Sequence, residues 1–265
     1  MNNSMSELWS RLGFLAIALV VYRIGTHIPI PGINPEQVAA LFQQSQGTIL
    51  QYFNLFSGGA LERMSIFALS VVPYISSAIV MQLFSNSVPY LQELKKDGQA
   101  GRNKITQYTR YGTVIFALIQ SSALTVTLQT AGLIDAGSIF SAFVAVISIV
   151  TGTMFLMWLG EQISERGIGN GISIIIATSI ITGVPRAFGQ ALEQTQQGDL
   201  NYLLLIVLAV LTLLVVAFVV FVENAQRKIT VNYAQRNQVR GMIQAPSSFL
   251  PLKLNMSGVI PAIFA

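Results

Sequence analysis

The chain has 265 residues, of which 52% are hydrophobic and only 10% charged, and its mean hydropathy is +0.60. A soluble globule of this composition would lack the polar residues to cover its surface, so we expect an all-α, polytopic membrane protein. The sequence contains no cysteine, which excludes disulfides and thiolate chemistry, and its net charge of +4 bears on orientation in the membrane.

Apolar windows of about 20 residues predict six membrane spans. They lie near residues 9–28, 64–86, 107–128, 138–160, 171–185 and 202–222, and a further apolar run begins near residue 257. The first run has no small-residue cleavage site, so we interpret it as a retained span and not as a signal peptide. Because residues 259–265 are too few to cross a membrane, we expect the chain to stop inside a helix; a re-entrant hairpin is the alternative.

Basic residues gather in alternate loops, which predicts the orientation of the chain. The positive-inside rule places these loops, together with the N-terminus, in the cytoplasm. They carry Lys95, Lys96, Arg102, Lys104, Arg166, Arg227, Lys228, Arg236, Arg240 and Lys253. The loops on the other side hold little beyond Arg63 and Arg186.

A short apolar helix is predicted at residues 53–63, and Ser57-Gly58-Gly59 interrupts it. Its length of about 18 Å is far less than the hydrocarbon thickness of about 30 Å, so it cannot span a membrane. Irregular backbone at membrane depth is tolerated only where protein or water covers it. We therefore expect this segment to fill or line a cavity.

Two pairs of aliphatic residues lie one helical turn apart in predicted spans. Val71 and Ile75 flank Pro73, which we expect to kink the second span, and Ile172 and Ile176 share a face of the fifth. On a helix that faces lipid such pairs would have no function. Taken alone, the spacing is a weak signal.

The glycine-rich stretch before the fifth span has two possible interpretations. Gly167, Gly169 and Gly171 resemble a phosphate-binding loop, but no strand precedes them and their spacing fits neither the dinucleotide nor the P-loop pattern. A tight turn, in which glycine allows positive φ, explains them better.

Charged and catalytic side chains within the predicted spans are few. Arg23, Arg110, Glu161 and Glu223 lie towards helix ends, where they can reach the interface, whereas a coupled transporter needs charges near mid-membrane. His27 is the only histidine, so a His-Glu-x-x-His zinc site is impossible, and we expect neither an enzyme nor a cofactor.

The cytoplasmic loop near residues 223–256 changes to a period of two. Ile229, Val231 and Tyr233 alternate with polar residues, which predicts a strand. Its basic residues suit an acidic protein surface or RNA phosphate, although a solvated loop that only fixes topology fits the pattern equally well.

Together these pieces resemble the SecY family, whose members form the centre of the bacterial protein-conducting channel. The stretches that carry the resemblance, in family order over nearly the whole chain, are Ile28-Pro-Ile-Pro-Gly32, Phe53-Asn-Leu-Phe-Ser-Gly-Gly-Ala60, Gln107-Tyr-Thr-Arg-Tyr-Gly112, Thr151-Gly-Thr-Met-Phe-Leu-Met-Trp-Leu-Gly-Glu161, Glu165-Arg-Gly-Ile-Gly-Asn-Gly-Ile-Ser-Ile-Ile-Ile176 and Val259-Ile-Pro-Ala-Ile-Phe264.

The resemblance implies a fold of ten helices in two inverted halves, of which this chain would supply the first. Residues 1–185 would form the five-helix half with a plug at about residues 50–63, and residues 186–265 would hold the sixth helix, the docking loop and the start of the seventh helix. The implied plug residues are Phe53, Asn54, Leu55, Phe56, Ser57, Gly58, Gly59 and Arg63.

The resemblance also implies roles for other residues. An apolar ring at the waist of the pore would contain Val71, Ile75, Ile172, Ile176 and Ile263. Ser76 and Ile79 would lie at a lateral gate. The ribosome or the SecA motor would dock on Arg227, Lys228, Arg236 and Arg240, with a possible contact to ribosomal RNA.

The function implied is a pore-forming subunit that moves unfolded secretory polypeptides across the bacterial cytoplasmic membrane and releases transmembrane segments sideways into lipid. SecE, SecG and polypeptides bearing signal sequences would be its partners, and the N-terminus would be cytoplasmic. Two alternatives stay open at this point: a secondary transporter or flippase with a broken helix at its substrate site, and a membrane scaffold without transport.

Overall fold

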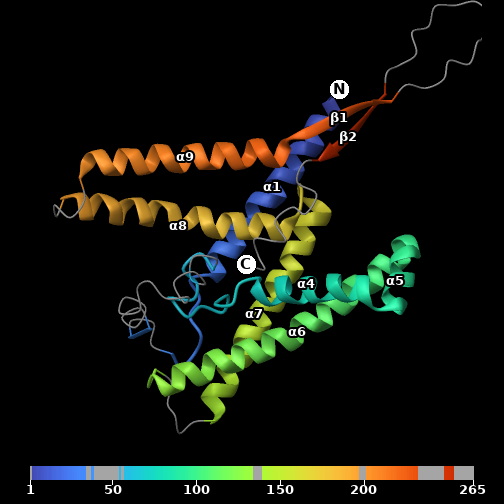
Figure 1. The fold of residues 1–265 in the computed structure, drawn as a ribbon. Coiled ribbons are helices and arrows are strands. Elements are labelled where there is room, and N and C mark those ends of the chain that lie inside the picture. The colour runs from blue at the N-terminus through green and yellow to red at the C-terminus, as the bar shows by residue number, and fades with distance from the viewer. Residues whose placement is uncertain are drawn as a thin grey trace, which may run out of the picture. The chain divides into compact units, whose positions relative to one another are not determined.

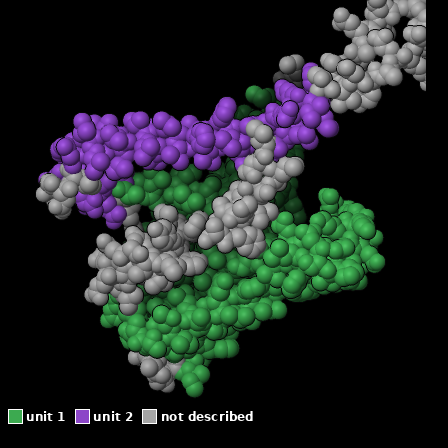
Figure 2. Space-filling view, viewed as in Figure 1, with its two compact units in different colours: residues 1–187 green, residues 188–265 purple. Residues whose placement is uncertain are grey.

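The structure, a computed structural model, describes residues 2–33, 37–38, 54, 57–133, 139–196, 201–231 and 248–253. Within these ranges the chain is mostly helical, with one two-stranded sheet (Figure 1). The chain divides into two compact units, residues 1–187 and 188–265, drawn in green and purple in Figure 2. The separate roles expected for residues 1–185 and 186–265 stay a prediction.

Five helices in the described ranges are long and apolar enough to cross a membrane. They are α1 (Asn2–Gly25), α6 (Gly98–Thr130), α7 (Ile139–Arg166), α8 (Gly171–Gln196) and α9 (Tyr202–Asn224). Two shorter helices are α4 (Val72–Ser87) and α5 (Pro89–Lys96). The residues of the expected seventh helix lie outside the described ranges.

The second predicted span starts later than the sequence pattern indicated. Residues 57–71 form turns, which we call the turn segment, and α4 begins only at Val72. Met64 and Ser70 have φ of 43° and 51°, a left-handed backbone that no helix accommodates. The kink expected at Pro73 is also wrong, because this proline lies in the first turn of α4, where its missing N–H leaves no helical bond unmade.

Two other helices are longer than predicted. With 33 residues, α6 is about 50 Å long, so its polar start, which carries Arg102 and Lys104, extends beyond a hydrocarbon core of about 30 Å. The fifth predicted span, expected to end at residue 185, continues through Pro185 to Gln196. The amphipathic α5, which buries Leu91 and Leu94, was not predicted.

Small residues allow α4 and α6 to pack closely side by side (Figure 1). The Ser77 hydroxyl of α4 donates to the Thr109 carbonyl of α6 at 2.7 Å, and a Cβ added at Gly112 would collide with the Ser77 hydroxyl. The buried face of α6 repeats small side chains every fourth residue, at Thr109, Thr113, Ala117, Ser121 and Thr125.

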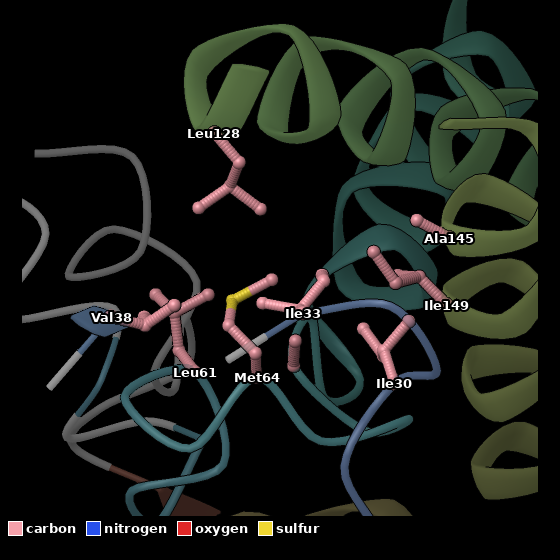
Figure 3. Packing of buried hydrophobic residues seen from close by; sticks show 9 residues of the cluster. Ile30, Ile33, Val38, Leu61, Met64, Leu128, Ala145 and Ile149 are labelled. Carbon is pink, nitrogen blue, oxygen red and sulfur yellow. The ribbon is translucent and has the colours of Figure 1, made fainter. Parts of the chain in front are cut away.

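One hydrophobic cluster joins the turn segment to the residues that follow α1. Figure 3 shows Met64 between Leu61 and Ile33, with Ile30 near Ile149 of α7 and with Leu128 of α6 on the other side of the cluster. Met64 is 1% exposed, so the left-handed turn at this residue is buried. This burial keeps the turn segment compact although it forms no regular helix.

The strand predicted in the loop after the sixth span is confirmed. β1 (Gln226–Val231) pairs antiparallel with β2 (Ser248–Lys253), with Ile229 opposite Leu250. The second strand was not predicted, since it contains Pro251, which cannot donate to a strand ladder. Asn201 begins α9 by accepting a hydrogen bond from the Leu203 N–H at 3.2 Å.

Candidate functional site

The middle of the turn segment pairs with the backbone that follows α1. Pro29 and Ser65 form an isolated β-bridge. The Ile30 N–H donates to the Met64 carbonyl at 2.9 Å, and the Ile66 N–H donates to the Ile28 carbonyl at 3.0 Å. Residues 64–66 are therefore fixed by main-chain bonds, independently of their side chains.

Phe67 fixes the same part of the turn segment through its side chain. Its ring stacks on Tyr22 of α1, with 6.2 Å between centroids, and on Phe155 of α7, at 5.9 Å. A Cβ at Gly25 would overlap the Phe67 ring, and one at Gly152 would collide with the Ile66 carbonyl. Two glycines on different helices thus open the slot that Phe67 fills.

A second buried cluster, which we call the Tyr22 cluster, surrounds this slot. It joins α1, the turn segment, α7 and α8 within the first compact unit. Its buried members are Ala18, Tyr22, Ala60, Phe67, Val71, Leu156, Leu159, Ile163 and Ile175. All of these except the Tyr22 hydroxyl group are apolar.

The start of α8 is fixed by the glycine-rich turn. Gly169 has φ of 74°, which confirms the prediction of a tight turn at this stretch. The Asn170 side-chain oxygen accepts from the Ile172 N–H at 3.1 Å, and the Ser164 hydroxyl oxygen accepts from the Gly171 N–H at 2.8 Å. These bonds cap α8 and set Ile172 against α7, where a Cβ at Gly160 would lie 2.8 Å from its Cγ1.

The structure brings together the four described residues of the predicted apolar ring. Val71 is 2% exposed just before α4, and the Ile75 N–H donates to its carbonyl at 3.1 Å. Ile75, Ile172 and Ile176 are half-buried and pack against the Tyr22 cluster. Ile263 lies outside the described residues. The role of these residues as a pore ring stays a prediction.

The predicted plug is described only in part. Ser57 is 2% exposed, and Gly58 lies so near α8 that a Cβ would be 3.2 Å from the Ser179 Cα. Gly58 and Gly59 have φ of 65° and 80°, as the predicted interruption requires, but residues 60–63 form turns and not the short helix expected there. The amide of Asn54 exchanges hydrogen bonds with Glu62. Phe53, Leu55 and Phe56 lie outside the described residues.

Arg63 of the turn segment lies in contact with His27, which follows α1. A ring nitrogen of His27 and the Arg63 guanidinium are 3.1 Å apart, so Arg63 of the predicted plug reaches the end of α1. A second pair joins α6 to α7: the Arg110 guanidinium donates to the Glu161 carboxylate at 2.8 Å. The charges of Arg110 and Glu161 thus neutralise each other.

The remaining predicted residues are those of the lateral gate and of the docking loop. Ser76 and Ile79 are half-buried on α4, and their role at a lateral gate stays a prediction. Arg227 and Lys228 are exposed on β1, whereas Arg236 and Arg240 lie outside the described ranges. Among the described residues, no group of three His, Asp or Glu side chains could hold a metal ion.

Comparison with known proteins identifies the family. The SecY family model matches residues 65–265. A protein translocase subunit SecY from Pseudomonas aeruginosa is 57% identical over 264 residues, covering 100% of this chain. The chain belongs to the SecY family. It spans 60% of the length of that SecY relative.

Solved structures of SecY and Sec61 share the fold. One, described as showing that the SecY plug domain stabilises the closed state and maintains a membrane seal, matches 93% of this chain and 52% of its own, with a TM-score of 0.64 and 22% identity. Sec61 in a canine ribosome–channel complex matches 84% of this chain and 49% of its own, with a TM-score of 0.59 and 21% identity. The expected all-α, multi-pass membrane fold and the resemblance to SecY are confirmed.

Proposed function

We propose that this chain lines the pore of a channel that carries unfolded polypeptides across the bacterial cytoplasmic membrane and releases transmembrane segments sideways into lipid. One observation carries the proposal: Val71 is a buried member of the Tyr22 cluster, and Ile75, Ile172 and Ile176 pack against the same cluster. We call these four residues the apolar cluster. Aliphatic side chains exclude water and ions from a constriction, yet they make no specific bond that would restrict the sequence of a passing chain. Such a site needs neither catalysis nor a cofactor.

Residues 53–63 are the stopper of this pore in the proposal. They precede Val71 in the sequence, and the charge distribution of the loops supports a position on the side opposite the cytoplasm. The N-terminus is then cytoplasmic. The solved SecY structure described by the sealing action of its plug supports the same assignment.

The β1–β2 hairpin is the proposed docking site for the SecA motor or the ribosome, and SecE and SecG are the proposed companion subunits. Arg227, Lys228 and Lys253 are exposed on this hairpin, and Arg236 and Arg240 come between the two strands in the sequence, outside the described residues. Positive charge suits the phosphates of ribosomal RNA and acidic protein surfaces equally. The canine ribosome–channel complex lends support to a ribosome partner.

The proposal is tested by the ion conductance of the complete channel in planar bilayers. Ile75→Asn combined with Ile176→Asn adds two amides to the constriction, so water wets it and the ion leak of the idle channel rises at least severalfold. The matched control is Ile181→Asn, the same change on α8 at a side chain that is 65% exposed. Equal conductance of the parent and the double variant contradicts the proposed pore.

A further inference from the structure

The hydroxyl of Tyr22 lies between the turn segment and α8. Its oxygen is 2.6 Å from the Ser179 Oγ and 3.4 Å from the Ser57 carbonyl oxygen. Tyr22 is 1% exposed and Ser179 is 0% exposed, and both lie within or beside the apolar Tyr22 cluster. Buried polar groups in such surroundings need hydrogen-bond partners, so the positions of the two hydroxyl hydrogens decide which acceptors are bound.

Two arrangements of the hydroxyl hydrogens satisfy this group. In the first, Ser179 donates to Tyr22 and Tyr22 donates to the Ser57 carbonyl. In the second, Tyr22 donates to Ser179, which donates to the Ile175 carbonyl 2.9 Å away. Each arrangement uses both hydrogens, because a hydroxyl both donates and accepts. Only the first arrangement holds Ser57.

The start and the middle of the turn segment are held in different ways. Residues 64–67 are fixed by main-chain bonds and by the Phe67 slot. Ser57 and Gly58 instead lie on α8 beside Ser179, where their contacts include the Tyr22 bond and the close approach of Gly58 to Thr182 and to the Ser179 backbone, and Ala60 follows in the Tyr22 cluster. The Ser57 end is therefore the one that can detach.

We propose that Tyr22 and Ser179 form a hydroxyl latch that holds the Ser57 end of the plug region while the channel is closed. When Ser57 leaves, the two hydroxyls rotate from the first arrangement to the second, so no buried donor loses its partner. The latch stabilises the closed state by one hydrogen bond and keeps the cost of opening low. This proposal rests on the proposed function, because it assigns the residues that position the stopper.

The latch predicts opposite effects for its two members. Tyr22→Phe removes the bond to Ser57 but keeps the ring that stacks on Phe67, so opening becomes easier and the idle leak rises about threefold to tenfold. Ser179→Ala removes the second arrangement, so opening leaves the Tyr22 hydroxyl without an acceptor and the leak falls by a similar factor, about threefold to tenfold. A merely structural role would move both variants in the same direction.

The experiment compares these variants as complete channels in planar bilayers. Ser179→Ala is measured in the leaky Ile75→Asn, Ile176→Asn background, where a decrease is resolved. Tyr22→Phe combined with Ser179→Ala should leak as Tyr22→Phe alone, because Ser179 acts only through the tyrosine hydroxyl. The control is Thr178→Val, which removes a hydroxyl on α8 that donates at 2.8 Å to its own helix, at the Ile174 carbonyl; it should leave the leak unchanged.

The outcomes separate the latch from the pore. A rise with Tyr22→Phe and a fall with Ser179→Ala, each measured per inserted channel so that poor folding cannot mimic the fall, support the latch. Equal leaks in parent and variants, or a rise with Ser179→Ala, overturn the latch. If the Ile75→Asn, Ile176→Asn background itself does not leak, the proposed pore fails, whatever Tyr22→Phe does in the parent background.

Discussion

Single residues of the turn segment decide where its backbone lies. Phe67 fits between α1 and α7 only because Gly25 and Gly152 carry no side chain there. The neighbouring backbone at Ser70 is left-handed, which costs energy for a residue other than glycine. The tight fit of Phe67 offsets that cost and fixes the residues that lead into the apolar cluster.

Gly152→Ala tests this fit. The new Cβ would collide with the Ile66 carbonyl, which is main chain and cannot rotate away, so we expect the free energy of unfolding of the complete protein to fall by about 1–3 kcal/mol. Thermal unfolding in detergent measures the change.

Gly13→Ala is the matched control on α1, since a Cβ there meets nothing within 4 Å. Alanine is a better helix former than glycine, so this variant should unfold at the same temperature or slightly higher. Equal stability of the Gly152 and Gly13 variants would show that Phe67 does not fill a tight slot.

Some residue-scale features were predictable and others were not. The i, i+4 spacing of Ile172 and Ile176 and the glycine pattern before them are local sequence signals. The structure agrees with both, because the two isoleucines pack against the same cluster and Gly169 has positive φ. Tyr22 and Ser179 are 157 positions apart, and neither belongs to a motif. Their contact depends on how α1 and α8 pack, which no local pattern encodes.

At the scale of elements, hydropathy located the spans better than it located their ends. The apolar run from residue 64 continues without a break into α4, yet its first residues form turns because they pack in two clusters at once. The left-handed backbone at Met64 and Ser70 has no composition signal, since both residues are common in helices. The expected helix start was therefore wrong by about two turns.

The hairpin after α9 was predictable only on one strand. Alternation of apolar and polar residues marked β1, whereas Pro251 obscured β2. The side chains of residues 226–229 and 249–253 are exposed, including Arg227 and Lys228. An exposed pair of strands with basic side chains is a suitable surface for an acidic partner.

Charge reversal on β1 tests this surface. Arg227→Glu with Lys228→Glu replaces two positive charges by two negative ones, so we expect the affinity of the complete channel for ribosomes or SecA to fall at least tenfold at low salt and the difference to shrink at high salt. Co-sedimentation of channel-containing vesicles measures the binding.

Arg227→Lys with Lys228→Arg keeps both charges and should bind as the parent does. Because it changes the same two positions, it separates charge from shape. An undiminished affinity of the Glu variant at low salt would remove the hairpin from the docking site.

At the scale of the whole molecule, composition alone predicted the class of protein. Few charges and long apolar runs required a helical membrane protein, and membership of the SecY family agrees with that class. The apolar cluster depends instead on the meeting of α4, α7, α8 and the turn segment. In the proposed pore, its aliphatic character would allow one constriction to block ions at rest and still accept polypeptides of many sequences.

The most direct test of this account is a disulfide crosslink between the channel and a polypeptide stopped in transit. The chain has no cysteine, so Ile75→Cys or Ile176→Cys introduces a single thiol at the apolar cluster, and Ile181→Cys introduces one at an exposed position of α8. A stalled polypeptide with one cysteine should crosslink to the first two variants and not to the third. Crosslinks to Ile181→Cys alone, or to none of the three, would contradict a pore at this cluster.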